Sequence, residues 1–191
     1  TGALSNSLVS TTAALGLSSP ISAMKNLLLG NVQLASTYGF VPLLKTWYQI
    51  GSNPRFQNAA FKKARESGAL GASQALLETA LIPKTGVKRG LTYLMERAEY
   101  LNRLVAVSTG DMVAQDALRV LRNKPTKMMN IEKSVARRIL GESLELSDEQ
   151  VIDAIQRGNF SQKALDKIYF MAHSSTQGLA DPVFMPKIMG N

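Results

Sequence analysis

Apolar residues between positions 87 and 109 recur with a spacing of four, three, four, three and four residues. This stripe consists of Val87, Leu91, Leu94, Ala98, Leu101 and Val105. The spacing places them on one face of an α-helix, which would be about 35 Å long at roughly 1.5 Å per residue. The pattern predicts a central helix over Val87–Thr109, with Leu94, Ala98, Leu101 and Val105 buried.

The polar residues of the same stretch predict a separate charged face. They are Lys88, Thr92, Glu96, Glu99 and Arg103. Glu99 and Arg103 stand four residues apart, the spacing of a helical ion pair. Gly110 followed by Asp111 predicts the end of this helix and the N-cap of a new one over Met112–Asn123.

Apolar spacing and turn signals predict five helices before the central one, the first a weak helix over Ala3–Leu15. Ser19 and Pro20 predict a helix start, after which Ile21, Met24, Leu28 and Val32 share one face. A further helix is predicted over Val41–Ile50, and another over Ser73–Leu81. Between these two, Asn53 and Pro54 predict a helix over Arg55–Ser67. In that helix Phe56, Ala60, Phe61 and Ala64 are expected to face inward, and Lys62, Lys63 and Arg65 outward.

Similar signals predict short helices after the central one. A helix is predicted over Ile131–Leu140, and it carries Lys133, Arg137 and Arg138. Ser147 and Gln150 form a capping-box pattern that opens a helix ending at Arg157, and Gly158 closes it. Ser161 is expected to cap a last helix with Leu165, Ile168, Tyr169 and Ala172 on its inner side. The tail from Ser174 has two prolines and two glycines, which predict an extended arm.

No segment alternates with a period of two for long enough to predict a strand, so the chain is expected to be all-α. The prediction is seven to nine short to medium helices around one long central helix, with an extended C-terminal arm. The loop Ile82–Gly86 is the best candidate boundary, between an apolar, acid-free segment 1–82 and a helical bundle with its tail, 83–191. One continuous domain is the alternative. Both termini fall in mid-pattern, which favours a fragment of a longer chain.

The net charge of +8 is unevenly distributed. No Asp or Glu precedes Glu66, whereas six basic residues do: Lys25, Lys45, Arg55, Lys62, Lys63 and Arg65. An apolar, mildly basic and acid-free first third favours an anionic partner, either lipid or nucleic acid, bound through these six side chains. The alternative is a helical hairpin buried inside a larger assembly.

The 19 residues from Asn26 to Leu44 carry no charge. That length is close to a membrane span, but Gly30, Asn31, Gln33, Gly39 and Pro42 disfavour a stable one. Interfacial or conditional insertion fits the composition better. Trp47 and Tyr48, beside Lys45, are candidates for contact with a partner or a membrane, or for a platform that stacks on bases. The alternative, which we favour, is that the pair caps the core.

Candidate catalytic chemistry is sparse. The chain has no Cys and one His, which excludes disulfides, thiolate chemistry and multi-His metal sites. Glu96 and Glu99 have a spacing that could supply two carboxylates, yet the neighbouring Arg97 favours a solvated charged face. His173 is expected to be an ordinary residue at a helix end, and the sequence has neither a Gly-rich phosphate loop nor G-x-S-x-G. We therefore predict no catalytic, cofactor-binding or metal-binding residue.

Three phrases, in this order, resemble the long helical parts of phage and mobile-element polyvalent proteins. The first is Leu15–Leu27, with its Ser-Pro, Ser-Ala and Asn-Leu pairs. The second runs from Glu96-Arg97 to Asn102-Arg103 and on through small residues to Gly110. The third is Thr176–Pro182, followed by Pro186 and Gly190. The resemblance spans nearly the whole chain and implies a helical, non-catalytic structural piece.

In that group, such segments belong to very long proteins that are packaged in a virion or delivered with DNA. Some are internal core or ejection proteins that assemble a conduit across the host envelope. The resemblance therefore implies a place in the virion interior and, on infection, in the host cell envelope. It implies further copies or other virion proteins as partners, DNA and anionic membrane as additional candidates, and neither a cofactor nor a small-molecule substrate.

Two other functional classes stay open. The first alternative is a helical nucleic-acid-binding module that uses two basic groups: Arg55, Lys62, Lys63, Arg65, Lys133, Arg137 and Arg138. Its signature would be an affinity for DNA that falls steeply with salt. The second, less favoured, is a helical cell-wall lytic enzyme domain acting through Glu96 or Glu99, which requires an open cleft and a raised carboxyl pKa.

Overall fold

The structure, a computed structural model, describes residues 20–68, 87–126 and 131–174, and this part of the chain is helical without a strand. The all-α prediction is thereby confirmed. The helices are α2 (Pro20–Tyr38), α3 (Phe40–Ser52), α4 (Pro54–Glu66), α6 (Val87–Leu121), α7 (Lys133–Arg138), the π-helix η1 (Ile139–Ser143), α8 (Asp148–Arg157) and α9 (Gln162–Ser174). Four predicted features lie outside the described residues: the helices over Ala3–Leu15 and Ser73–Leu81, the boundary at Ile82–Gly86 and the C-terminal arm.

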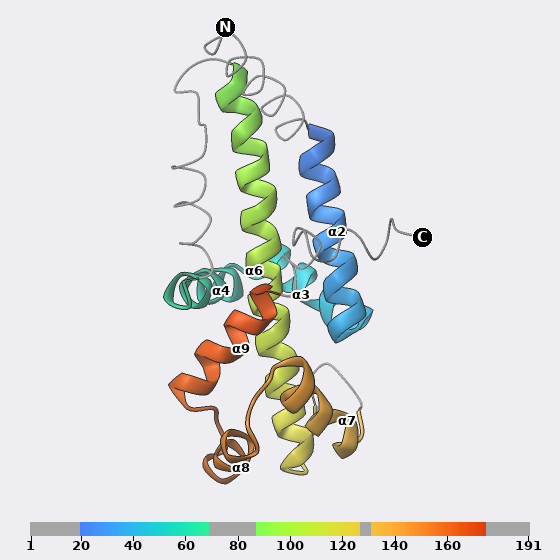
Figure 1. Cartoon of the computed structure of the whole chain (residues 1–191), viewed down its shortest axis with the longest axis vertical. Helices are drawn as coiled ribbons and strands as arrows, with labels where there is room; N and C mark the ends of the chain where they lie inside the picture. The colour runs from blue at the N-terminus through green and yellow to red at the C-terminus, as the bar shows by residue number, and fades with distance from the viewer. Residues whose placement is uncertain (1–19, 69–86, 127–130, 175–191) are drawn as a thin grey trace, which may run out of the picture.

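Helix α6 is the axis on which the other helices pack (Figure 1). Helix α2 runs beside it, α3 and α4 cross near its middle, and α7, α8 and α9 surround its C-terminal part. All ten residues from Asn102 to Asp111 are buried. Successive side chains on a helix point about 100° apart. Over this stretch, therefore, α6 has no side that faces solvent.

The predicted helix end at Gly110 is wrong, because α6 continues through it to Leu121. The glycine serves a close approach between helices instead of a cap. A Cβ at Gly110 would lie 2.4 Å from the Cβ of Ala172 on α9, a distance that real Cβ atoms essentially never show. Asp111 likewise lies inside the helix, where its carboxylate binds side chains of α4 and α9.

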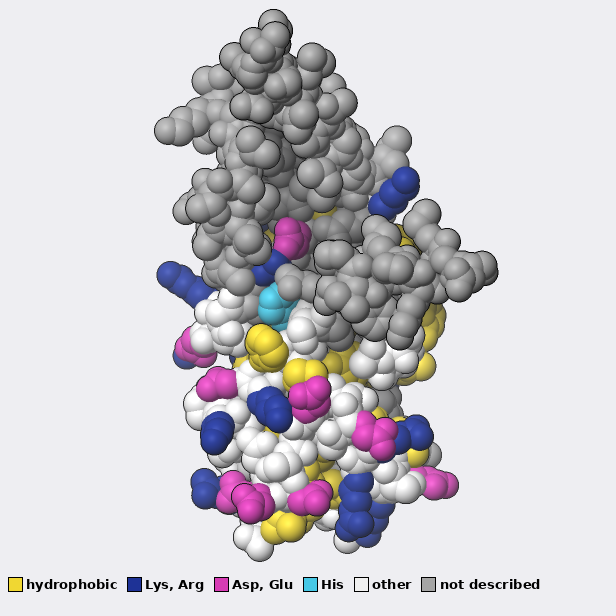
Figure 2. Space-filling view, viewed as in Figure 1, with side chains coloured by type: hydrophobic (Ala, Val, Ile, Leu, Met, Phe, Trp, Pro, Cys, Tyr) yellow, Lys and Arg dark blue, Asp and Glu magenta, His cyan; other side chains and the backbone are white. Residues whose placement is uncertain are grey.

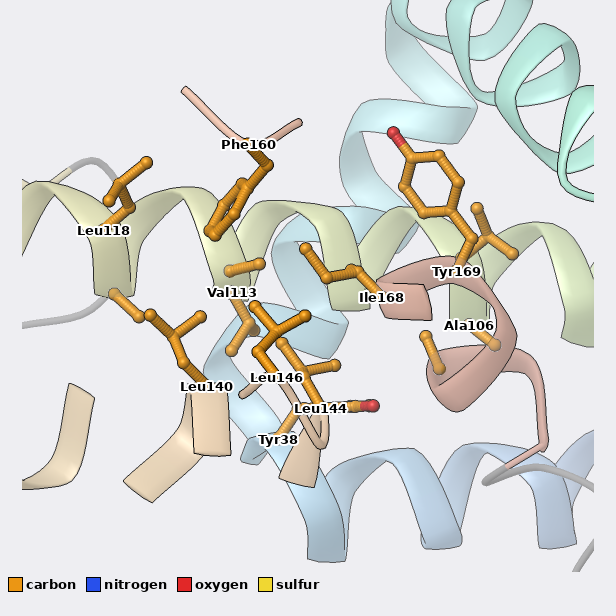
Figure 3. Packing of buried hydrophobic residues seen from close by; sticks show 14 of the residues in the cluster. Tyr38, Ala106, Val113, Leu118, Leu140, Leu144, Leu146, Phe160, Ile168 and Tyr169 are labelled. Atoms are coloured by element: carbon orange, nitrogen blue, oxygen red, sulfur yellow. The ribbon is translucent and has the colours of Figure 1, made fainter. Parts of the chain in front are cut away.

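Side chains from nearly every helix form one core around α6 (Figure 3). Ala98 and Val105 are buried as predicted, whereas Leu101 is half-buried and the side chain of Leu94 is not described. Leu34 of α2 and Leu43 of α3 belong to the same core as Leu104 of α6. Residues from both predicted segments, 1–82 and 83–191, therefore contribute to this core. Around the C-terminal half of α6, the core side chains shown in Figure 3 include Leu140, Leu144, Leu146, Phe160 and Ile168.

The local helix signals are confirmed at several ends. The Asn53 side chain accepts hydrogen bonds from the backbone N–H groups of Arg55 and Phe56, and α4 begins at Pro54. Ser147 and Gln150 form the reciprocal capping box of α8, which ends at a left-handed Gly158 with φ of 82°. In the predicted helix over Ile131–Leu140, the α-helical part stops at Arg138 and a π-helix follows.

We expect Gly110→Ala to destabilise the fold, because the new methyl group would overlap Ala172. Overpacking of this kind costs about 1–3 kcal/mol, which a urea-induced unfolding curve would resolve. Gly51→Ala is the matched control, since a Cβ at Gly51 has nothing within 4 Å and should leave stability unchanged or raise it by up to about 1 kcal/mol. Equal midpoints for the two variants would contradict the close packing of α6 against α9.

Candidate functional site

The charged face predicted on the central helix is not solvated at Arg103. This side chain is buried, with 1% of its surface exposed, and its guanidinium donates to the carboxylate of Glu99 one turn earlier. Arg103 is enclosed because the packing of α6 leaves no side of the helix open at this level. Glu99 is therefore engaged as the partner of a buried cation. The side chain of Glu96 lies outside those that the structure describes.

His173 lies in the last turn of α9, as predicted, and is buried. Burial lowers the pKa of its imidazole below the usual 6.5, and the positive charge of Arg103 lowers it further. A backbone hydrogen bond and the negative charge of Glu99 act in the opposite direction without reversing the shift. The side chain is thus held in its neutral form at pH 7.

A polar junction joins α4, α6 and α9 at Asp111. The Lys63 ammonium lies 2.6 Å from one carboxylate oxygen of Asp111, and the Tyr169 hydroxyl donates to the other at 3.3 Å. Burial and the adjacent Asp111 carboxylate raise the pKa of Tyr169 well above its usual value, so the phenol stays a hydrogen-bond donor. Lys63 is therefore paired with a residue of another helix, although 40% of its side-chain surface stays exposed. Its assignment as an anion-binding residue stays a prediction.

Two further polar contacts bind the first helices to each other and to α6. The Thr109 hydroxyl donates to the Thr46 hydroxyl at 3.1 Å, with both side chains buried. The Trp47 indole N–H donates to Asn31 Oδ1 at 2.6 Å and so links α3 to α2. Trp47 thus packs against the core, as the favoured interpretation had it, whereas Tyr48 beside it is 70% exposed. No sequence pattern had indicated these pairs, because each joins residues from different helices.

Helix α2 exposes an apolar arc. Its members are Met24, Leu28, Leu29 and Val32, which are between 47 and 71% exposed. The stripe predicted from Met24, Leu28 and Val32 therefore exists but faces solvent. Leu34 and Tyr38 are the buried side chains on the opposite side, and there α2 packs on α6.

Helix α3 likewise exposes apolar side chains on one side and buries the other. Its apolar arc consists of Phe40, Val41, Leu44 and Tyr48, between 51 and 70% exposed. Leu43, Thr46 and Ile50 are buried on the other side. At about 100° per residue, the exposed residues of each helix fall within an arc of roughly 140° that points away from α6. The two arcs together are called the contact face below.

The other predicted anion-binding side chains lie on α2 and α3, which carry the contact face, and on α4. Lys25 of α2 and Lys45 of α3 are exposed, as are Arg55 and Arg65 of α4. Lys62 is also exposed and lies 3.8 Å from Glu66, its i,i+4 neighbour. From Pro20 to Arg65 the sequence has no acidic residue, so α2 and α3 carry no carboxylate and α4 carries only Glu66 at its end.

A second group of basic side chains lies near the C-terminal end of α6, where α7 packs. Arg137 and Arg138 of α7 are exposed and line a shallow hollow of about 480 Å³ together with Ser134, Val135, Gly141 and Glu142. Figure 1 shows α7 beside the C-terminal part of α6, away from α4. The seven residues assigned to nucleic-acid binding therefore do not form one patch. Basic and acidic side chains alternate over the α7–α9 end in Figure 2, in contrast to the acid-free helices α2 and α3.

Among the described residues, no group of three or more acidic, His or Cys side chains could hold a metal ion. None of the described helices is long and apolar enough to cross a membrane. No protein-family model, characterised protein or solved structure matches the chain.

We expect the free energy of unfolding to fall as the pH drops below about 6.5. The pKa of His173 is lower in the folded chain than in the unfolded one, so in this range unfolding takes up a proton. The contribution is complete above about pH 6.5 and is lost as the pH falls to the lowered pKa. An NMR titration can follow the imidazole directly, because the chain has a single His. A measured pKa of 6.5 or higher would contradict the burial.

The pair Lys63–Asp111 should be coupled energetically, because Asp111 is buried and the contact is short. The test is a double-mutant cycle with Lys63→Met and Asp111→Asn, in which urea-induced unfolding measures the stability of each variant. We expect a coupling free energy of about 1 kcal/mol or more. Lys62 and Glu66 on the same helix form the control pair, because they are 3.8 Å apart and exposed. Their coupling should be near zero, and equal couplings for the two pairs would count against the junction.

Proposed function

We propose that this chain is a non-catalytic structural module of a phage internal virion or DNA-ejection protein, which docks through the contact face of α2 and α3. The observation that carries this proposal is the exposure of eight large apolar side chains on two adjacent helices. Scattered apolar residues are normal on protein surfaces, but a contiguous stripe on a helix marks an interaction site. Each arc has the spacing of such a stripe.

The polar interior supports a structural role. Glu99, the described member of the carboxylate pair considered for catalysis, binds a buried arginine, and His173 is held neutral beside it. The buried groups Thr46, Thr109 and Asp111 join one helix to another. These interactions fix α3, α4 and α9 on α6, and the Trp47–Asn31 hydrogen bond links α2 to α3. The contact face is thereby held on a rigid support.

The resemblance to polyvalent and ejection proteins adds the biological setting. It supports a location in the virion interior and, during infection, in the host cell envelope. The partners would be further copies of the chain or other virion proteins, with DNA and an anionic membrane as additional candidates. The contact face provides the apolar area for such an assembly, and its two lysines provide positive charge.

A nucleic-acid-binding module is the second candidate, favoured by the hollow beside Arg137 and Arg138 on α7. Phosphate contacts by arginines release counterions, so DNA affinity would fall steeply with salt. In that case Arg137→Glu with Arg138→Glu should abolish binding, and changes in the contact face should not affect it.

The main test replaces one exposed leucine in each arc of the parent protein, Leu28→Ser and Leu44→Ser. Both side chains are already exposed, at 65 and 51%, so folding should be unchanged. We expect the double variant to be missing from purified virions, as measured by quantitative mass spectrometry, and plating efficiency to drop with it.

Ile152→Ser is the matched control, because Ile152 is a comparably exposed apolar residue on α8. It should leave incorporation at the wild-type level. Normal incorporation of the contact-face variant, or a parent protein that is absent from wild-type virions, would refute the proposal.

A further inference from the structure

We propose that the contact face, once the chain has reached the host cell envelope, binds an anionic lipid bilayer, on whose surface α2 and α3 lie without crossing it. This inference rests on the proposed function, since it names what the same face binds. Three observations carry it: the place of the lysines, the distribution of acidic residues, and the way in which the two helices are held on α6.

The lysines lie within or at the edge of the apolar arcs. On a helical projection Lys25 falls between Val32 and Leu29, and Lys45 falls about 40° beyond Val41. Both lysines are exposed. Protein–protein interfaces are depleted in lysine at their centre. At a bilayer surface, by contrast, the aliphatic part of a lysine can lie in the apolar layer while its ammonium reaches the headgroups.

The charged residues of α2 and α3, the two helices that form the face, are of one sign. The sequence from Pro20 to Arg65 contains Lys25, Lys45 and the basic residues of α4, with no carboxylate among them. Arg55 and Arg65 are exposed on α4, the helix that follows α3. An anionic headgroup layer is complementary to this pattern. The opposite end of the molecule carries both signs of charge, so it would not bind the same surface as strongly (Figure 2).

The inner sides of both helices limit how deeply they can insert. Leu34 and Tyr38 of α2 and Leu43 and Ile50 of α3 are buried in the core of the folded chain. Thr46 is also held by the hydroxyl of Thr109 on α6. Only the outer arcs are free to leave water, and none of the described helices can span a bilayer. The arrangement therefore fits amphipathic helices that lie in the plane of the interface.

The test is sedimentation of the purified 191-residue chain with vesicles of phosphatidylcholine, either alone or mixed with phosphatidylglycerol. We expect binding to the mixed vesicles, binding that weakens as salt rises, and little binding to phosphatidylcholine alone. Leu28→Ser with Leu44→Ser should weaken binding by about tenfold or more, because two apolar side chains that enter the bilayer surface are replaced by polar ones. Lys25→Glu with Lys45→Glu should abolish the preference for the anionic lipid.

Two variants at the other end of the molecule provide controls. Ile152→Ser on α8 and Arg137→Glu with Arg138→Glu on α7 match the test variants in type and should bind vesicles like the wild type. Circular dichroism would establish that every variant is folded.

Several results would overturn the proposal. The first is equal loss of vesicle binding in test and control variants, or no vesicle binding by the wild type. The second is a stable dimer that Leu28→Ser with Leu44→Ser dissociates, without vesicle binding, which would make a second copy the partner of the face. In both cases the virion experiment still decides the proposed function by itself. Conversely, vesicle binding combined with normal virion incorporation of the leucine variant would keep the lipid site and refute the assembly role.

Discussion

The complete enclosure of α6 between Asn102 and Asp111 is the constraint on which the rest of this structure depends. Four helices reach this stretch from different sides, and at two of the contacts there is no room for a larger residue. A Cβ at Gly30 of α2 would lie 2.7 Å from the amide nitrogen of Asn102, and one at Gly110 would overlap Ala172 of α9. Because no side of α6 is open there, its polar residues must find partners inside the protein. Asp111 does so with Lys63 and Tyr169.

This enclosure explains which elements could be predicted from the sequence. Helix caps depend on residues within one turn, so the signals at Asn53 and Ser147 were sufficient. A glycine at position 110 can serve either a helix cap or a close approach between helices. The close approach depends on Ala172, which lies 62 residues further along the chain. The pair Glu99–Arg103 has the same spacing on a surface as in a core, so the sequence could not reveal that Arg103 is buried.

The candidate site was only partly predictable for a related reason. The count of basic residues identified Lys25, Lys45, Arg55, Lys62 and Arg65, which are exposed, and also Lys63, which is paired with a residue on another helix. Helical periodicity found the stripe of Met24, Leu28 and Val32, but a period cannot tell whether a stripe is covered. Its exposure follows from Gly30 and Leu34, which direct the opposite side of α2 onto α6.

The hydrogen bond between Trp47 and Asn31 has an optical consequence. Trp47 is the only tryptophan of the chain, and its indole N–H is bound to the neighbouring helix at 2.6 Å. All of the chain's tryptophan fluorescence therefore originates at the seam between α2 and α3. If the two helices separate, the indole loses this bond and gains contact with water, and its emission shifts to longer wavelength. The protein thus contains an intrinsic spectroscopic reporter of whether the helical pair stays closed.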